Sequence, residues 1–495
     1  MPALDPGDCT RLHFARYARA IQGVEPTTRT LYPSARPREV PNEGTTTVSK
    51  VLLKGGTVLP MSKTDPVSTR SDVLIDDGIV VAIAPAIDAD AETVDCSGRL
   101  VLPGFVDTHR HTWETLLRNC APDATLDEYF ARVLDHYAPY FTADDVYAGN
   151  LLGALECLNA GITTLVDWSH INNSPDHPEA AIQALRDSGI RAQYAYGPAN
   201  DVLPGALAPE PTAMPVAEIR RLHNAHFSSN DALLTMALAA RGPGFTSDEI
   251  VRTEWAAARD LGIPITFHAG MSRVAGRMAM VEHLERLQLL GPDITYIHAN
   301  HFADREWKLV ADSGGTLSLS PQVEMQMNHG WPPVHKAREF GLRPSLSVDV
   351  VTSVPGDMFT QMRALFAAER ARVNAISWEE DTPTPPDMLT AAEVLTMATS
   401  NGAHTVGLED RIGTLAVGKR ADIVVIDGRG VNIAPVNDPI GAVVLSADVS
   451  NVEHVLVNGS FKKRDFALVA DVARAVALAE QAAAGVLSRA DTSSR

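Results

Sequence analysis

The feature that most constrains the fold is the alternation of eight short apolar runs with alanine-rich stretches of helical periodicity. Strands that each precede a helix form a parallel sheet, and eight such units close into a barrel. The sequence therefore predicts an α/β fold, a (β/α)8 TIM barrel, over residues 100–409. The eight runs are 100–109, 161–168, 191–197, 232–240, 263–268, 294–299, 315–320 and 344–349, and the helical stretches include 143–160, 248–261, 275–290 and 357–374.

Two further segments, 48–99 and 410–466, contain short β-patterned runs on either side of the predicted barrel. Asp77-Gly78 between two of these runs indicates a hairpin. We expect both segments to form one composite β-sandwich domain that the barrel interrupts. The proline-rich residues 1–47 are expected to form an N-terminal extension that either lies on a neighbouring subunit or is mobile. Residues 467–495 are expected to form a C-terminal helix and tail that cap or dimerise the chain.

Composition excludes some classes of partner. The chain has 495 residues, 42 of them basic and 61 acidic, and its net charge of −19 argues against nucleic acid or an anionic membrane as a partner. The four cysteines have no CxxC spacing, which is typical of a reducing compartment. We expect a cytoplasmic homodimer or homotetramer with no membrane segment, acting on a small molecule.

Residues that can bind metals stand at the ends of several predicted strands. His109 and His111 end the first run, and residues i and i+2 of a strand point the same way. His268, His298 and Asp349 end the fifth, sixth and eighth runs. One such histidine is usually structural, but five ligand-type residues at the barrel face where active sites form indicate a metal site.

The ligand types and the absence of a lysine from the first six strands predict the kind of metal site. Imidazole and carboxylate ligands suit Zn²⁺ best among the candidates, with Fe²⁺, Mn²⁺ and Co²⁺ also accepted. No lysine occurs between residues 64 and 307, so the first six strands offer no lysine that could be carboxylated to bridge two ions. The sequence therefore predicts one divalent metal ion.

The pattern resembles the amidohydrolase superfamily over about residues 48–465. The resemblance is carried by residues 103–111, by His268 and His298, by Asp349, and by the segment 413–422. The nearest branch is that of triazine hydrolases, cytosine deaminase and S-adenosylhomocysteine deaminase. The resemblance implies that His109, His111, His268 and Asp349 ligate the metal, and that His298 polarises the substrate or shuttles a proton.

The mechanism expected from this resemblance is hydrolysis by a metal-activated water, whose pKa the ion lowers from about 15.7 towards ~7. Asp349 would accept the proton of the water, and His298 would stabilise the oxyanion and protonate the leaving nitrogen. We therefore expect a mononuclear amidohydrolase that cleaves an amide, carbamate or urea-type C–N bond.

One departure from the family pattern limits the choice of substrate. The deaminases of this branch carry a glutamate three residues after the strand-5 histidine, where this chain has Met271. Methionine cannot donate a proton, and it is expected to line an apolar pocket, so a small apolar or aromatic substrate that needs no ring protonation fits better. The alternative is an aminohydrolase that releases ammonia from an N-heterocycle, with Glu324 or His301 in place of the glutamate. Outside that alternative, Glu324 and His301 are candidates for binding the substrate. A third hypothesis, from another class, is a catalytically inactive assembly protein that keeps the fold.

The remaining candidates concern substrate binding. The insertion 112–140 is long and rich in aromatic residues, so it is interpreted as a lid over the site. Trp113 is a candidate for stacking on an aromatic substrate. Arg241, at the end of the fourth run, is a candidate for holding a carbonyl or carboxylate, with a structural ion pair as an equal alternative. His170, after the second run, is a weaker candidate for the same pocket.

Overall fold

The computed structural model describes residues 50–62, 64, 67–198, 213–227 and 229–493. The predicted N-terminal extension, residues 1–47, lies outside these ranges. Within them, no helix is both long enough and apolar enough to cross a membrane.

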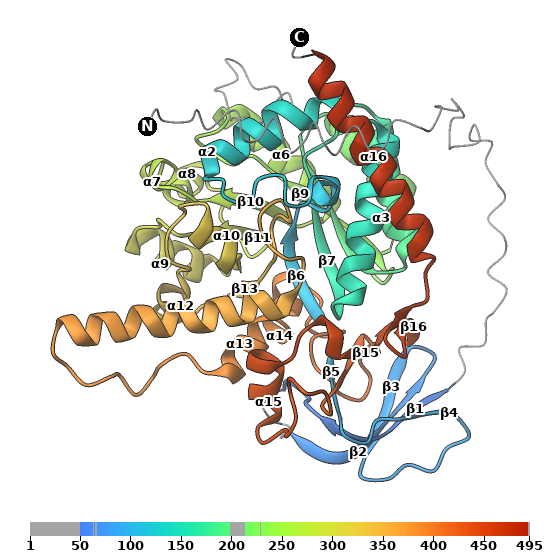
Figure 1. Ribbon diagram of the computed structural model, residues 1–495. Helices are drawn as coiled ribbons and strands as arrows, with labels where there is room; N and C mark the ends of the chain where they lie inside the picture. Colours follow the sequence, from blue (N-terminus) through green and yellow to red (C-terminus); the bar gives the residue numbers. More distant parts are fainter. Residues whose placement is uncertain (1–49, 63, 65–66, 199–212, 228, 494–495) are drawn as a thin grey trace, which may run out of the picture. The chain divides into compact units, whose positions relative to one another are not determined.

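Eight parallel strands form the barrel predicted from the alternating pattern (Figure 1). Each strand pairs with the next along the chain, and a parallel bridge between Arg110 and Asp349 joins the last segment back to the first. The prediction of a (β/α)8 fold is confirmed. The strands are β6 (Phe105–Arg110), β7 (Ile162–Ser169), β8 (Arg191–Tyr196), β9 (Leu234–Ala239), β10 (Ile265–Ala269), β11 (Ile294–His298), β12 (Thr316–Leu319) and β13 (Ser345–Leu346).

Helices follow these strands and cover the barrel. Between β6 and β7 lie η1 (Thr112–Leu117), α2 (Leu126–Tyr129), η2 (Phe130–Tyr137), η3 (Ala138–Tyr140) and α3 (Ala143–Asn159). The later helices are α4 (Asp176–Ser188), α5 (Val216–His226), α6 (Asp248–Leu261), α7 (Arg273–Arg277), α8 (Met280–Leu287), α9 (Asp304–Ser313), α10 (Pro321–Gln326), α11 (Val334–Glu339), α12 (Met358–Glu379), α13 (Ala391–Met397) and α14 (Ser400–Thr405). The helix expected over 275–290 is divided, because Ala279 takes a left-handed backbone with φ +47°.

A second, mixed sheet of nine strands combines segments from both sides of the barrel in the sequence. It has its own apolar core, which includes Val51, Val73 and Ile423. The prediction of a second β domain built from separated segments is confirmed. Its strands are β1 (Val51–Val58), β2 (Ser68–Asp76), β3 (Ile79–Ala84), β4 (Glu92–Asp95), β5 (Arg99–Pro103), β14 (Ile423–Asp427), β15 (Val452–Val457), β16 (Ser460–Arg464) and β17 (Ala467–Leu468).

The apolar run 100–109 serves both sheets and is not a single strand. Its first part, β5, pairs antiparallel with β14, whereas its second part, β6, pairs with β7. Gly104 separates them, and a Cβ atom there would lie 2.1 Å from Thr163 Oγ1. Apolar character alone could not reveal this division, because both parts are fully buried.

Asp422 links the nine-stranded sheet to the barrel. Its carboxylate makes two contacts with the guanidinium of Arg191 on β8, at 2.7 and 3.1 Å, and accepts a hydrogen bond from the Asn458 N–H at 2.8 Å. Its carbonyl accepts one from the Gly104 N–H at 2.9 Å. The side chains of Arg191 and Asp422 are 4% and 1% exposed, so this ion pair is shielded from water.

Three short helical elements and one long helix complete the chain. The short ones are α15 (Pro439–Gly441), η5 (Ala442–Ser446) and η6 (Val449–Asn451), and the long one is α16 (Val472–Ser493). Figure 1 shows α16 running alongside α3, and Arg489 joins them through an ion pair with Asp145. The expected C-terminal helix is present and packs against the barrel's own helix layer.

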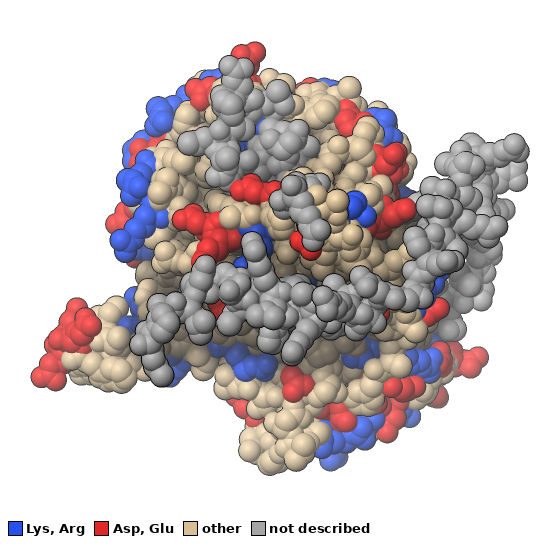
Figure 2. All heavy atoms as spheres, turned by 45° about the horizontal axis from the view of Figure 1, so that its top comes forward, with Lys and Arg blue, Asp and Glu red and all other residues tan. Residues whose placement is uncertain are grey.

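On the face drawn in Figure 2, acidic side chains are interspersed with basic ones. The acidic excess of the sequence is therefore mixed with basic groups on this face rather than gathered in one patch.

The Arg191–Asp422 pair gives a stability prediction. We expect Arg191→Met to lower the free energy of unfolding by about 3–5 kcal/mol, because it leaves a buried carboxylate without its counter-charge. The measurement is the midpoint of urea unfolding. Arg220→Met, which removes the exposed partner of Asp260, is the matched control and is expected to cost no more than about 1 kcal/mol. Equal costs for the two variants would contradict the prediction.

Candidate metal centre

The end of β6 directs two histidines into the barrel and the arginine between them outward. His109 and His111 are buried, 0% and 4% exposed. Arg110 points into the helix layer, where it forms ion pairs with Glu156 on α3 and with Asp107. The register of β6 against β7 shifts between Asp107 and Arg110. From His109 to His111, neighbouring side chains point to opposite sides, so the two imidazoles face inward while Arg110 faces outward.

Closure of the barrel brings Asp349 to the same place. The Asp349 N–H donates to the carbonyl of His109 at 3.0 Å, and the His111 N–H donates to the carbonyl of Asp349 at 2.9 Å. Asp349 itself has a left-handed backbone, with φ +70°. These backbone contacts hold its carboxylate beside the two imidazoles.

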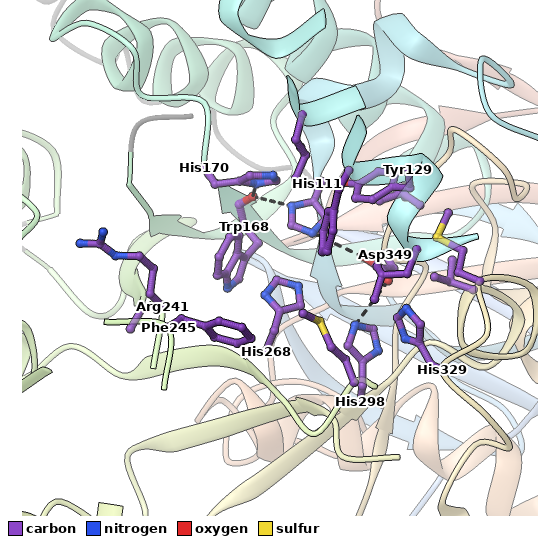
Figure 3. Close-up of a pocket in the computed structure, with 18 residues that line it drawn as sticks. His111, Tyr129, Trp168, His170, Arg241, Phe245, His268, His298, His329 and Asp349 are labelled. Atoms are coloured by element: carbon purple, nitrogen blue, oxygen red, sulfur yellow. Dashed lines mark hydrogen bonds and ion pairs between the residues drawn. The ribbon is translucent and has the colours of Figure 1, made fainter. Parts of the chain in front are cut away.

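His268, near the end of β10, completes a cluster of four ligand-type side chains. Figure 3 shows three of them, His111, His268 and Asp349. His109 Nε2 lies 3.1 Å from Asp349 Oδ1 and 3.2 Å from His268 Nε2. His111 Nε2 lies 3.4 Å from Asp349 Oδ1. One ligand atom from each of the four residues lies within 4.8 Å of the others.

These spacings fit a divalent ion. Metal–ligand distances of about 2.0–2.1 Å place tetrahedral ligand atoms about 3.3–3.4 Å apart, close to the spacings found here. His111 Nδ1 donates to the carbonyl of Trp168 at 3.1 Å, which leaves the Nε2 lone pair directed at the cluster. Burial lowers the pKa of His109, of His111 and of His268, which favours the neutral imidazole that a metal ion binds.

The carboxylate of the cluster is ionised. Burial alone would raise the pKa of Asp349, but the neighbouring imidazoles, His109 first, hold this pKa below its usual value. Three imidazoles and one carboxylate therefore converge, which is a donor set that can hold one divalent metal ion.

His298, the last residue of β11, stands next to the cluster and is paired with a carboxylate. Its Nδ1–H donates to Glu324 Oε1 at 3.2 Å, and its Nε2 lies 3.6 Å from Asp349 Oδ2. Burial opposes protonation of His298, but the hydrogen bond to Glu324 and the charge of Asp349 outweigh it and raise the pKa of His298 above its ordinary value. His298 also has a left-handed backbone, with φ +75°.

A cavity opens over the cluster, and most of its wall is apolar or aromatic. Leu126, Tyr129, Phe130 and Leu134 come from the insertion 112–140, as expected for a lid over the site. Phe245, Met271, Val323, Met327 and Val350 add to the apolar wall, and Trp168 stands against the ring of His268 with centroids 4.5 Å apart.

Two of the expected substrate-binding residues line this cavity: Arg241 and Met271. The guanidinium of Arg241 also makes a buried ion pair with Glu254 on α6, at 3.1 Å. The position of Arg241 therefore agrees with both roles considered for it, binding of a substrate carbonyl or carboxylate and formation of a structural ion pair. Figure 3 shows Arg241 and Phe245 on the side of the cavity away from His298.

The other three expected substrate-binding residues lie outside the lining of the cavity. Trp113 is fully buried behind it, packed edge-to-face on Phe141 and His170 with centroids 4.9 and 5.3 Å away. His301 is half-buried on the loop after β11. Glu324 reaches the site through His298 rather than facing the cavity.

Sequence reasoning missed several residues of the cavity. His329 lines it from the loop after α10, and Trp168 lines it from β7. His170 was considered only weakly, but it lines the cavity too. The only signal was position: Trp168 is the last residue of the second run and His170 follows it by two residues. No pattern in the sequence marked His329.

A second group of ligand-type atoms adjoins the first: His111, Glu114 and His170. Tyr129 Oη–H donates to Glu114 Oε1 at 2.6 Å, and this pair ties the lid to the residues below it. His111 has already committed Nδ1 to a carbonyl and directs Nε2 at Asp349, so it has no lone pair left for another ion. This group is therefore not a second metal site.

Comparison with known proteins agrees with this geometry. The model of the Amidohydrolase family matches residues 100–462. The chain is 28% identical over 430 residues to 5-methylthioadenosine/S-adenosylhomocysteine deaminase of Symbiobacterium thermophilum, covering 84% of this chain and 94% of the relative. It is 30% identical over 432 residues to 5'-deoxyadenosine deaminase of Methanothermobacter thermautotrophicus, with the same coverage.

Two solved structures share the fold. An adenosine deaminase from Xanthomonas campestris with bound zinc has a TM-score of 0.78 at 23% identity, covering 89% of this chain and 98% of that one. An atrazine chlorohydrolase from Arthrobacter aurescens complexed with zinc has a TM-score of 0.78 at 22% identity, covering 88% and 100%.

Together, the barrel, the histidine–aspartate cluster and the cavity above it define a metal-dependent hydrolase that acts on a small molecule. The chain belongs to the amidohydrolase family, as its sequence pattern predicts. It is an enzyme that hydrolyses carbon–nitrogen bonds and uses a divalent metal ion.

The cluster gives a prediction of metal content. We expect the purified protein to bind one equivalent of Zn²⁺, measured by mass spectrometry after dialysis, and His268→Ala to lose it because three ligands remain. His170→Asn changes a buried histidine outside the cluster and is expected to keep one equivalent. Two equivalents in the native protein, with one lost in His170→Asn, would show that the second group also holds an ion.

Proposed function

We propose that this chain is a mononuclear zinc hydrolase that cleaves a C–N bond of a small, uncharged, apolar or aromatic molecule. His109, His111, His268 and Asp349 are its proposed metal ligands, and Asp349 and His298 its proposed catalytic residues. The observation that carries the proposal is the cluster of four ligand atoms at the base of a largely apolar cavity. Zinc is favoured over Fe²⁺, Mn²⁺ and Co²⁺ by its fit to imidazole and carboxylate ligands in a tetrahedral arrangement.

In the proposed mechanism the metal ion activates water, and side chains of the protein transfer the proton. When bound, the divalent ion acts as a Lewis acid that makes water a nucleophile at neutral pH. Asp349 accepts the proton that the attacking water loses. Because His298 Nε2 lies 3.6 Å from Asp349 Oδ2, His298 can take this proton and deliver it to the leaving nitrogen.

Glu324 supports this transfer without touching the substrate. Its carboxylate accepts the Nδ1–H hydrogen bond of His298, which fixes the ring and stabilises its protonated form. The backbone N–H of Ser320 holds Glu324 Oε1 in place at 2.8 Å. Glu324 is thus a positioning residue for the proton shuttle.

The cavity wall supports an uncharged substrate. Charged groups near the cavity are matched within the protein: Arg241 by Glu254, and Glu324 by His298 when that ring is protonated. Met271, at the position where deaminases of this branch carry glutamate, adds an apolar surface instead of a proton donor. Amides, carbamates, ureas and heteroaromatics with a displaceable amine fit this wall.

A second candidate is an aminohydrolase that releases ammonia from an N-heterocycle. It is favoured by the relatives, which are named as deaminases of 5-methylthioadenosine, S-adenosylhomocysteine and 5'-deoxyadenosine. The expected substitute acids do not face the cavity in the structure, since Glu324 is bound to His298 and His301 lies outside the lining.

One experiment tests both candidates. The zinc-loaded protein is incubated with amides, carbamates, ureas and amino-substituted N-heterocycles, and the products are identified by mass spectrometry together with an ammonia assay. We expect release of an organic amine from members of the first three classes. Ammonia from the heterocycles alone would favour the deaminase, and no turnover of any class by protein with a full equivalent of zinc would contradict the proposed function.

The pairing of Glu324 with His298 gives a kinetic prediction. We expect Glu324→Gln to lower kcat by about 10²-fold, since the amide can still accept the hydrogen bond but no longer stabilises the protonated ring. Zinc content and KM are expected to change little. Glu339→Gln, the same replacement at an exposed position of α11, is the control. Unchanged kcat in Glu324→Gln would remove Glu324 from the mechanism.

The homodimeric or homotetrameric state, the cytoplasmic location and the exclusion of nucleic acid remain predictions from the sequence. Sedimentation of the purified protein measures the first directly.

A further inference from the structure

His329 has no role in the proposed mechanism, yet it lines the cavity and both of its ring nitrogens lack a hydrogen-bond partner among the described residues. It lies on the loop between α10 and α11 and is 2% exposed. Within the part of the chain that the structure describes, neither Nδ1 nor Nε2 of His329 has a hydrogen-bond partner. Its backbone N–H donates to the carbonyl of Glu324 at 2.9 Å, which anchors the loop to the end of α10.

The unpaired ring nitrogens of His329 destabilise the folded protein, and they can form hydrogen bonds with a ligand. A buried polar atom left without a hydrogen-bond partner destabilises the folded protein. Burial also lowers the pKa of His329 to about 3, so its imidazole is neutral and offers one N–H donor and one acceptor nitrogen. A ligand that meets either atom recovers part of that cost.

The position of His329 determines which part of the substrate it can reach. Its ring stands edge-to-face against that of His298, with centroids 4.8 Å apart and planes at 86°. Figure 3 shows the two rings side by side on the same side of Asp349. If His298 protonates the leaving nitrogen, His329 lies next to the atoms one or two bonds away from it.

We propose that His329 is a substrate-binding residue that hydrogen-bonds a further heteroatom on the carbon under attack, one beyond the leaving nitrogen and the carbonyl oxygen or ring nitrogen. The substrate class is then narrower than that of the proposed function, on which this inference rests. Ureas, carbamates and amino-substituted azines carry such a heteroatom, whereas simple amides carry carbon at that position. His329 thus supplies polar recognition on a wall where Met271 supplies none.

The test uses two probes that differ only at this atom. Phenylurea has N–H where 2-phenylacetamide has CH₂, and both are titrated into the zinc-loaded protein by saturation-transfer NMR. His329→Phe keeps an aromatic ring against His298 and removes both nitrogens, and His329→Asn restores a donor and an acceptor. His223→Phe, on the outer helix α5, is the matched control.

We expect the native protein to bind phenylurea about three- to tenfold more tightly than 2-phenylacetamide, the range expected for one net hydrogen bond. His329→Phe is expected to abolish this preference, His329→Asn to keep part of it, and His223→Phe to leave it unchanged. The same preference in His329→Phe as in the native protein would overturn the inference. The inference would also be overturned if the native protein bound the two probes equally tightly, or bound neither of them.

Hydrolysis is followed in the same spectra and in the substrate screen, so the two failures can be told apart. Turnover with no effect of His329→Phe on probe preference contradicts only the role of His329. A preference that depends on His329, in protein that hydrolyses no substrate of any class, contradicts only the proposed function.

Discussion

The closure of the barrel is the constraint on which the site depends. The last strand segment meets the first through the backbone contacts of Asp349 with His109 and His111. The same contacts that close the sheet therefore set the distance between the carboxylate and the imidazoles. A ligand set drawn from residues 240 positions apart in sequence becomes local because the fold joins its two ends.

Around the metal-ligand cluster, buried charged side chains form ion pairs, and most of the cavity wall is apolar or aromatic. Arg110 is held by Glu156 and Asp107, Arg241 by Glu254, and His298 by Glu324. Pairing matters because an isolated buried charge is far more costly than a matched one. The ionised carboxylate of Asp349 faces the imidazole cluster, and a metal ion is the partner that this arrangement suits best.

The sequence predicted the strands, the composite second sheet and the residues of the cluster, because each of these follows from periodicity or from a strand end. It did not reveal the division at Gly104, since both halves of that run are buried and only packing against Thr163 separates them. Trp113 was expected to contact a substrate, but its direction depends on the turn after β6. His329 reaches the cavity from the loop after α10, whose residues follow neither helical nor strand periodicity.

His298 and Asp349 both hold a left-handed backbone, which most side chains avoid and which costs about 1–3 kcal/mol at each position. At these two positions, the residue that catalysis requires lowers the stability of the folded protein. A directed-evolution campaign that selected only for heat resistance would gain by placing glycine at either residue, and would thereby discard the reactive groups. Libraries built on this scaffold should keep both codons fixed.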